Sequence, residues 1–303
     1  MSKPWVEKYR PTNLENVILS ETNKLIIHNI IEKDYFPNLL LYGPPGTGKT
    51  TTIINLLNTY QKTYNQQNKE LIIHLNASDD RGIDVIRNQI HQFIHSKNMF
   101  NKGLKFVILD EADYMTKPAQ QALRHLMQNY NTNVRFCLIC NYISKIDENL
   151  QNEFLKLRVN ELPKEEILKF LKNIIHEEKI TISDEKLSQI QKFYISDMRS
   201  MINFLQSNQD NINVITHETW EQLLNIIKQQ KVKEIIDKIH DISIHCNSCK
   251  KIVIRDFFNF LIIQKKTTTP DFLDFVENIV HSEVKTNITV NYFASNICKY
   301  LNL

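Results

Sequence analysis

The stretch Gly43-Pro44-Pro45-Gly46-Thr47-Gly48-Lys49-Thr50 decides the fold of this chain. It fits the pattern G-x-x-x-x-G-K-[ST], in which backbone N–H groups surround the phosphates of a bound nucleotide. The chain has only 5 glycines in 303 residues, and three of them fall in this stretch. We therefore expect glycine to be kept here because the backbone takes positive φ values or approaches a ligand closely.

The residues on both sides of this loop favour a strand before it and a helix after it. Asn38 to Tyr42 is a short apolar run, typical of a buried parallel strand. Lys49 to Asn58 continues without a helix breaker. A helix that begins at the loop points its free N–H groups and its positive dipole end at the phosphates. We predict that the Lys49 amine reaches the β- and γ-phosphates and that the Thr50 hydroxyl ligates Mg²⁺.

An acidic motif, Asp110-Glu111-Ala112-Asp113, directly follows the apolar run from Lys105 to Leu109. Open α/β sheets bind ligands at the carboxyl ends of their strands, which is where these carboxylates lie. We predict that Asp110 holds Mg²⁺, directly or through water, and that Glu111 orients or activates the attacking water. Alone, the motif could equally be an acidic turn, but downstream of a phosphate-binding loop it indicates nucleotide hydrolysis.

The first half of the chain alternates strand-like and helix-like segments, which predicts an α/β domain with a parallel sheet. After Pro163 the pattern changes to amphipathic helices, the first of which has acidic residues in its first turn. We predict three domains, at 1–162, 163–213 and 214–303. The expected strands are Leu39 to Tyr42, Leu71 to Asn76, Lys105 to Leu109 and Val134 to Cys140.

Composition and charge narrow the class of protein. The net charge of +3 is too small to indicate a nucleic-acid partner by itself, so any binding must come from a local basic patch. No apolar run approaches the ~20 residues that a membrane span needs. The first ten residues lack the apolar segment of a secretory signal, so we expect an intracellular protein with no membrane association.

The 5 cysteines are an odd count, which predicts free thiols rather than a set of disulfides. Cys246 and Cys249 form one C-x-x-C pair. A structural zinc site needs four ligands, and only His240 and His245 could complete one here. A pair of loop or helix-end thiols is the favoured interpretation, and zinc is the alternative.

With both nucleotide motifs in hand, the chain resembles the small subunits of the replication factor C family, which are AAA+ clamp-loader ATPases. The resemblance covers residues 1 to about 207 in the right order. It includes an N-terminal box, a box after the second strand, a helix after the acidic motif, a sensor 1 strand and a sensor 2 helix. In the same order, the first four stretches are Pro4 to Pro11, Leu75 to Asp84, Gln120 to Arg124 and Arg135 to Tyr142. The sensor 2 helix comprises Ser196 to Arg199 and Met201 to Asn203.

The resemblance implies an α/β P-loop AAA+ domain with a parallel sheet, a small helical lid domain and an all-α C-terminal collar domain. It places Asn141 at the hydrolytic water or the γ-phosphate, and Arg199, from the lid, at the γ-phosphate. The residues predicted to be catalytic are Lys49, Asp110, Glu111, Asn141 and Arg199. The residues predicted to bind ATP are Val6, Tyr9 and Arg10, near the adenine, together with Gly43, Pro44, Pro45, Gly46, Thr47, Gly48, Lys49, Thr50, Thr51, Asn141 and Arg199.

The function that the resemblance implies is an ATPase that uses ATP and Mg²⁺ to load a sliding clamp onto primer–template DNA. Its implied partners are the other subunits of a hetero-pentamer, the sliding clamp, and DNA held by its backbone, with Arg81, Arg87 and Lys117 as candidate phosphate contacts. The expected location is a site of DNA replication, in a nucleus or in a viral cytoplasmic replication site. The alternatives are a nucleotide-binding structural subunit with little hydrolysis, and a related AAA+ remodeller or checkpoint loader.

The resemblance breaks at three positions. Family members that serve a neighbouring subunit carry Ser-Arg-Cys after sensor 1, and this arginine reaches the neighbour's ATP. Here the aligned stretch is Asn152-Glu153-Phe154, so a carboxylate replaces the arginine. His125 replaces a second arginine of the family, and Ser196 replaces a glycine. We predict that this chain activates no neighbour, and that its own hydrolysis depends on an arginine from another subunit.

Overall fold

The computed structural model describes residues 3–78, 85–96, 103–129, 133–209, 215–246, 248–265, 268–282 and 284–301. Contacts divide the chain into two compact units. The first unit consists of residues 1–181 and 191–207, and the second of residues 182–190 and 208–303. The division into three domains stays a prediction.

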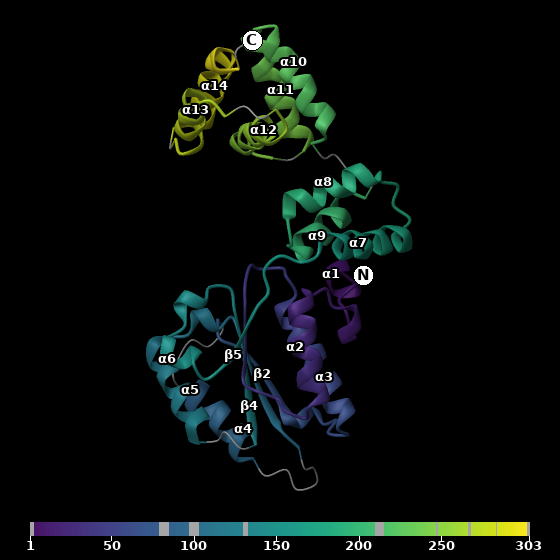
Figure 1. The fold of residues 1–303 in the computed structure, drawn as a ribbon, viewed down its shortest axis with the longest axis vertical. Helices are drawn as coiled ribbons and strands as arrows, with labels where there is room; N and C mark the ends of the chain where they lie inside the picture. Colours follow the sequence, from purple (N-terminus) through teal and green to yellow (C-terminus); the bar gives the residue numbers. More distant parts are fainter. Residues whose placement is uncertain are drawn as a thin grey trace. The chain divides into compact units, whose positions relative to one another are not determined.

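A parallel sheet lies at the centre of the first unit, with the strand order β2-β3-β4-β1-β5 among the described residues (Figure 1). Leu39, Leu40 and Leu41 of the central strand β1 are buried, because neighbouring strands and covering helices exclude water from both faces of the sheet. All four predicted strands are present to within one residue at either end. The strands are β1 (Leu39–Tyr42), β2 (Ile72–Asn76), β3 (Lys105–Asp110), β4 (Val134–Cys140) and β5 (Leu155–Arg158).

Strand β5 was missing from the predicted strands, and its sequence explains why. Leu155-Lys156-Leu157-Arg158 alternates apolar and basic residues, and only Leu157 is buried. The strand pairs with β1 and forms one edge of the sheet. It therefore lacks the continuous apolar run that identifies a central parallel strand.

Helices cover both faces of this sheet. In Figure 1, α2 and α3 lie on one side of the strands, and α5 and α6 lie on the other. Helix α7 begins at Lys164, directly after Pro163, as the sequence predicts. The helices whose residues fall in the first unit are α1 (Trp5–Lys8), α2 (Glu21–Glu32), α3 (Lys49–Thr63), α4 (His91–His95), α5 (Lys117–Asn129), α6 (Glu148–Gln151), α7 (Lys164–Glu178) and α9 (Met198–Ser207). Short helical turns occur at Leu14–Asn16, Lys69–Leu71, Ala112–Tyr114 and Ile143–Lys145, and a π-helix at Val85–Ile90.

The second unit is helical throughout its described residues. Its core is rich in aromatic side chains, and Phe257, Phe258 and Phe293 are among its fully buried members. Helix α8 (Asp184–Tyr194) crosses the boundary between the units. The helices that follow are α10 (His217–Lys228), α11 (Val232–His245), α12 (Lys250–Lys265), α13 (Pro270–Val280) and α14 (Thr286–Tyr300). The predicted fold class, a parallel α/β domain followed by helices, is confirmed.

Within the described ranges, no helix combines the length and the apolar character needed to cross a bilayer.

Candidate functional site

The glycine-rich loop joins β1 to α3 and has the backbone that its sequence predicts. Gly43, Gly46 and Gly48 have φ values of 148°, 74° and 85°. Gly48 is left-handed and directly precedes the first residue of α3. A Cβ atom placed on Gly46 would lie 1.8 Å from an oxygen of Asp197, just before α9. Position 46 is therefore restricted by its own backbone and also by a carboxylate packed against it.

The Lys49 side chain folds back beneath this loop and is almost fully buried. Its Nζ atom donates hydrogen bonds to the carbonyl oxygens of Gly43 (2.8 Å) and Pro44 (2.7 Å) and to Oδ1 of Asn141 (2.9 Å). Asn141 follows β4, which pairs with β1, so the sheet brings the two side chains together. Burial lowers the pKa of Lys49, although the nearby Asp110 carboxylate opposes this effect. The amine thus connects the loop with the end of β4.

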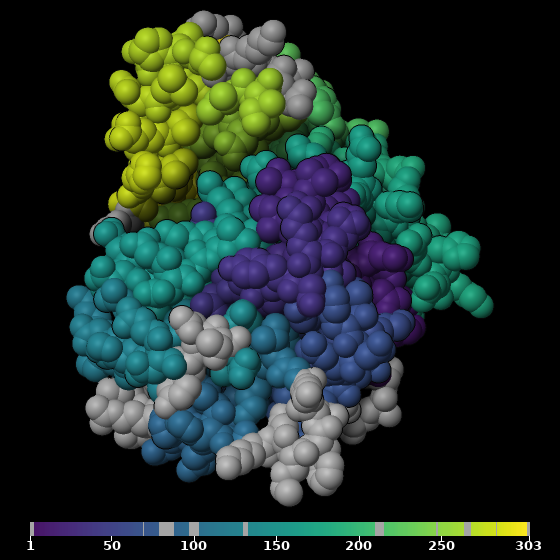
Figure 2. Space-filling model, turned by 60° about the horizontal axis from the view of Figure 1, so that its bottom comes forward, coloured from purple at the N-terminus to yellow at the C-terminus, as the bar shows by residue number. Residues whose placement is uncertain are grey.

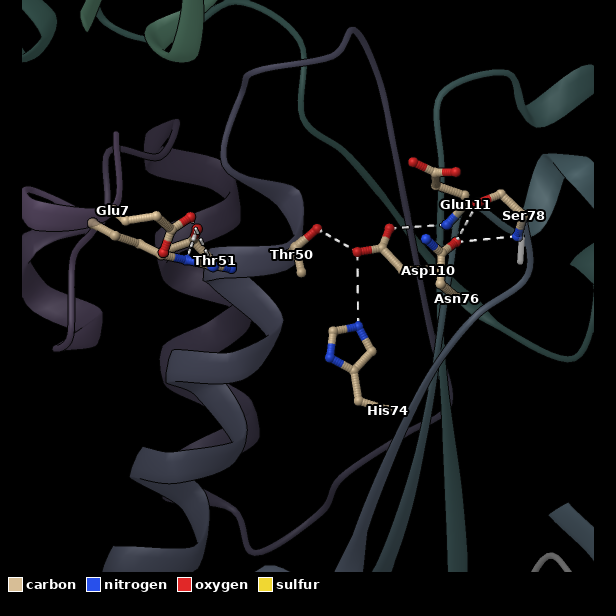
Figure 3. A network of polar contacts seen from close by, with 9 residues as sticks. Glu7, Thr50, Thr51, His74, Asn76, Ser78, Asp110 and Glu111 are labelled. Carbon is tan, nitrogen blue, oxygen red and sulfur yellow. Dashed lines mark hydrogen bonds and ion pairs between the residues drawn. The ribbon is translucent and has the colours of Figure 1, made fainter. Parts of the chain in front are cut away.

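Asp110 and Thr50 meet across the ends of β3 and α3 (Figure 3). Oδ2 of Asp110 accepts a hydrogen bond from the Thr50 hydroxyl at 2.7 Å and lies 3.8 Å from Nε2 of His74. Burial opposes ionisation of Asp110, but the nearby His74 imidazole and the hydrogen bonds from the Thr50 hydroxyl and the Glu111 backbone outweigh it and hold the pKa below its usual value. These two oxygen ligands fit Mg²⁺, which takes one or two protein oxygens and keeps several waters.

Glu111 has an unusual backbone for its residue type. Its φ and ψ angles are 52° and 38°, which place it in the left-handed region. This conformation costs a residue with a Cβ atom about 1–2 kcal/mol. Its backbone N–H donates to Oδ1 of Asp110 at 2.9 Å (Figure 3). Strained residues of this kind cluster at functional sites, where surrounding contacts hold them in place.

A cavity of about 280 Å³ gathers most of the residues that the sequence analysis named. Gly43 and Pro44 are absent from its lining and contribute their carbonyls to Lys49 instead. The lining also includes the apolar residues Val17, Phe170 and Ile202. The predicted residues that line the cavity are Val6, Tyr9, Arg10, Pro45, Gly46, Thr47, Gly48, Lys49, Thr50, Thr51, Asp110, Glu111, Asn141 and Arg199. Their individual roles stay predictions.

The structure adds polar residues to which the sequence analysis gave no role. Asp113 is buried, its Oδ1 accepts a hydrogen bond from the Asn141 backbone at 3.4 Å, and its Oδ2 has no hydrogen-bond partner among the described residues. Asp197 accepts hydrogen bonds from the backbone N–H and the hydroxyl of Ser200, which fixes the start of α9. The Asp three residues before Ser200 is the local pattern of a helix cap, and it could have indicated this contact.

Ser196, one of the departures from the family pattern, also has a definite contact. Its hydroxyl accepts a hydrogen bond from the backbone N–H of Leu162 at 3.0 Å, and the side chain is buried. The serine therefore ties the segment before α7 to the segment before α9.

The described residues include the side chain of only one of the three candidate DNA contacts. Arg81 lies outside them, and so does the side chain of Arg87, whose backbone belongs to the π-helix Val85–Ile90. Lys117 is exposed at the first residue of α5. All three stay predictions.

The C-x-x-C pair lies at the end of α11 and before α12. Cys246 is half-buried, Cys249 is exposed, and both have free thiols. Over the parts of the chain that the structure describes, no three His, Cys, Asp or Glu side chains are grouped so that they could hold a metal.

The sequence is similar to those of known proteins, and the similarities identify its family. Residues 39–161 match the profile of the ATPase family associated with various cellular activities (AAA). Replication factor C small subunit 2 of Pyrobaculum islandicum is 39% identical over 234 residues, which cover 77% of this chain and 72% of that protein. The chain belongs to the replication factor C family. Replication factor C subunit 5 of Homo sapiens is 44% identical over 216 residues, and the match covers 71% of this chain and 63% of the human protein.

This member of the replication factor C family also shares its fold with a more distant ATPase. The RuvB Holliday junction branch migration motor of Thermotoga maritima superposes with a TM-score of 0.54 at 14% identity. The match covers 95% of this chain and 90% of RuvB. At this identity the likeness concerns the fold alone.

Proposed function

We propose that this chain is an ATP-hydrolysing subunit of a clamp loader, which helps to place a sliding clamp on primer–template DNA. One observation carries the proposal: the Lys49 amine, the Thr50–Asp110 pair and Arg199 of α9 line the same cavity. The relatives named replication factor C support the assignment to a clamp loader. Its partners would be companion subunits, the clamp and the DNA backbone, and it would act where DNA is replicated.

In this proposal, different residues of the chain bind the phosphates, hold Mg²⁺ and position the attacking water. The loop N–H groups and Lys49 bind the β- and γ-phosphates, and Thr50 and Asp110 hold Mg²⁺. When bound, Mg²⁺ neutralises charge on the phosphate oxygens. Glu111 accepts the proton of the attacking water. Asn141, held by Lys49 and by Asp113, orients this water.

Arg199 would report the state of the nucleotide to the lid helices. It lies on α9, and the neighbouring Met198 N–H donates a hydrogen bond to the carbonyl of Gly46 at 3.1 Å. A guanidinium–phosphate contact is charge-assisted and can be bidentate, so it holds α9 only while the phosphate is present. Binding and loss of the γ-phosphate would then change the angle of the lid.

The test of the proposal is reconstitution with the companion subunits, the clamp and primed DNA. We expect Lys49→Ala to lower ATP turnover by about 10²–10³-fold, because it removes a cation from the reacting phosphates. Clamp loading should fall with it. If loading by the Lys49→Ala complex equals that of the wild type, the alternative of a nucleotide-binding structural subunit replaces the proposal.

Glu153 bears on the neighbouring subunit rather than on this chain's own site. Its Oε1 accepts a hydrogen bond from Gln128 at 3.3 Å and lies 3.6 Å from Nε of Arg124, so α5 holds the carboxylate in place. It also lines a surface hollow of about 590 Å³ together with residues of α2. Figure 2 shows purple residues from near the N-terminus lying against teal residues from the middle of the chain.

We propose that Glu153 leaves the adjoining ATP site without an activating cation. A carboxylate repels a triphosphate, whereas an arginine at such a position is worth about 10³–10⁵ in rate. Glu153→Arg should raise the ATPase rate of the reconstituted complex if the adjoining site is otherwise complete. Glu153→Gln is the matched control, because it removes the negative charge without supplying a cation. Equal rates for wild type and Glu153→Arg would refute this role.

A further inference from the structure

Glu178 joins the N-terminal segment to helix α7. Its Oε1 accepts hydrogen bonds from Nζ of Lys8 and from the hydroxyl of Tyr9, each at 2.6 Å. The Glu178 side chain is 19% exposed, so the carboxylate is largely covered by these partners. No local sequence pattern connects the residues, because they lie at opposite ends of the first unit's sequence.

Helix stability does not account for a carboxylate at this position. Glu178 is the last residue of α7, where the partial negative charge of the helix end disfavours an anion. The hydrogen bonds from Lys8 and then Tyr9 hold the pKa of Glu178 below its usual value. The charge is therefore stabilised by the N-terminal segment rather than by its own helix.

Tyr9 carries this contact to the nucleotide cavity. The residue lines the cavity, and its ring packs edge-on against the buried Trp5 at 6.4 Å. The backbone N–H of Trp5 donates a hydrogen bond to Oε1 of Gln206 on α9 at 3.0 Å. One short segment thus holds both α7 and α9, the two helices that supply Phe170 and Arg199 to the same cavity.

We propose that Glu178 is a positioning residue for the base of the bound nucleotide. It holds the Tyr9 side chain at the cavity, whose lining also includes the apolar side chains of Val17, Phe170 and Ile202 as surfaces for a flat heterocycle. The phosphates bind separately, at the glycine-rich loop. Occupancy of the base site and attachment of α7 are therefore coupled through Tyr9 and Glu178. This inference rests on the proposed nucleotide-binding function.

The chain offers a matched control for this contact. Lys24 of α2 donates a hydrogen bond to Oε1 of Glu166 in the first turn of α7, also at 2.6 Å. This pair links the same helix α7 to the α/β part of the unit, but neither residue lines the cavity. Loss of the Glu166 carboxylate removes an equivalent ion pair without touching Tyr9.

The test measures the affinities of the full chain for ATP and for inorganic tripolyphosphate, both with Mg²⁺. We expect Glu178→Ala to weaken ATP binding by up to about tenfold, because a Tyr9 side chain that is not held in advance must be ordered when the base binds. Tripolyphosphate has no base, so its affinity should stay within about twofold. Tyr9→Phe should give a similar selective loss, and combining it with Glu178→Ala should add little further. Glu166→Ala should leave both affinities unchanged.

Several outcomes would overturn the inference. Unchanged ATP affinity in Glu178→Ala, an equal loss for tripolyphosphate, or an equal loss in Glu166→Ala would each contradict a role through Tyr9. If Glu178→Ala does not fold, Glu178→Gln tests the same point with an acceptor oxygen retained, and the same selective loss is expected at smaller size. A wild-type chain that binds neither ligand would instead refute the proposed function itself.

Discussion

The two units have interiors of opposite character. The first unit buries ionisable and amide side chains, including Lys49, Lys105, Asp113 and Gln120. In the second unit, Thr289 is the single buried polar side chain among the described residues, and the interior is packed with phenylalanine and isoleucine. A buried polar group costs free energy unless it is paired, so its presence calls for a compensating role. The comparison indicates that chemistry resides in the first unit and that the second is built for packing.

Not every buried charge of the first unit belongs to the cavity. Lys105 begins β3, and its Nζ donates hydrogen bonds to the carbonyls of Phe93 (2.7 Å) and Ile94 (3.0 Å) and to the hydroxyl of Ser96 (3.0 Å). These acceptors lie at the end of α4, where a cation is favoured by the helix dipole. The buried amine of Lys49 therefore belongs to the cavity, whereas that of Lys105 closes a helix end.

The largest expected effect concerns the charged residues that line the cavity. Glu111→Gln should lower ATP turnover of the reconstituted complex by about 10²–10⁴-fold, because the amide cannot take a proton from water. ATP affinity and thermal stability should stay close to those of the wild type. The exposed Glu15→Gln is the control. A variant that retains full turnover would remove Glu111 from the mechanism.

The converse change targets the interior of the second unit. Phe258→Ala removes a fully buried ring and should lower the free energy of unfolding of this unit by about 3–5 kcal/mol. ATP affinity of the folded protein should not change. Calorimetry and ATP titration test the two statements, with Leu273→Ala in the same unit, a residue that is 42% exposed, as the control. If folded Phe258→Ala protein bound ATP more weakly than the wild type, the interior of the second unit would contribute to nucleotide binding.

Lys105→Met tests the buried charge that closes the end of α4. It should destabilise the first unit by about 1–3 kcal/mol, because buried carbonyls at the end of α4 lose their donor. ATP affinity should be retained, since Lys105 does not line the cavity. Chemical denaturation combined with ATP titration separates these effects. If Lys105→Met lowered ATP affinity without lowering the stability of the first unit, Lys105 would instead contribute to nucleotide binding.

The smallest effect is a dependence on pH. The pKa of Glu178 is lowered from 4.5 by Lys8 and Tyr9, so its contribution is present above pH 4.5 and is lost as the pH falls through the lowered value. The melting temperatures of wild type and Glu178→Ala should therefore differ at neutral pH and converge in acid. The Phe258→Ala difference should not follow this pattern, because no titrating group was removed. A constant Glu178→Ala difference across the acid range would contradict the ion pair.

Features that depend on neighbouring residues could be predicted from the sequence, whereas contacts between residues far apart in the sequence could not. Four of the five described strands and the glycine-rich loop were predicted because apolar runs and positive-φ glycines are local features. Strand β5 was missed because Leu155-Lys156-Leu157-Arg158 alternates apolar and basic residues and lacks the apolar run that identified β2, the other edge strand. The contacts of Tyr9 with Glu178 and of Gly46 with Asp197 join distant parts of the sequence, and no local pattern contains them. Most of the polar residues of the cavity were thus predictable, whereas its apolar lining and the contacts that position it were not.

The approach of Asp197 to Gly46 has a consequence for how this sequence can change over time. A side chain at position 46 is blocked while the carboxylate stands 1.8 Å from where its first carbon would be. Loss of that carboxylate alone frees the space but uncaps α9. A replacement of Gly46 therefore needs a change at Asp197 as well, and the positive φ of position 46 would still strain the new residue. A mutational library confined to the loop would attribute the glycine to phosphate binding alone and would overlook its contact with the residue before α9.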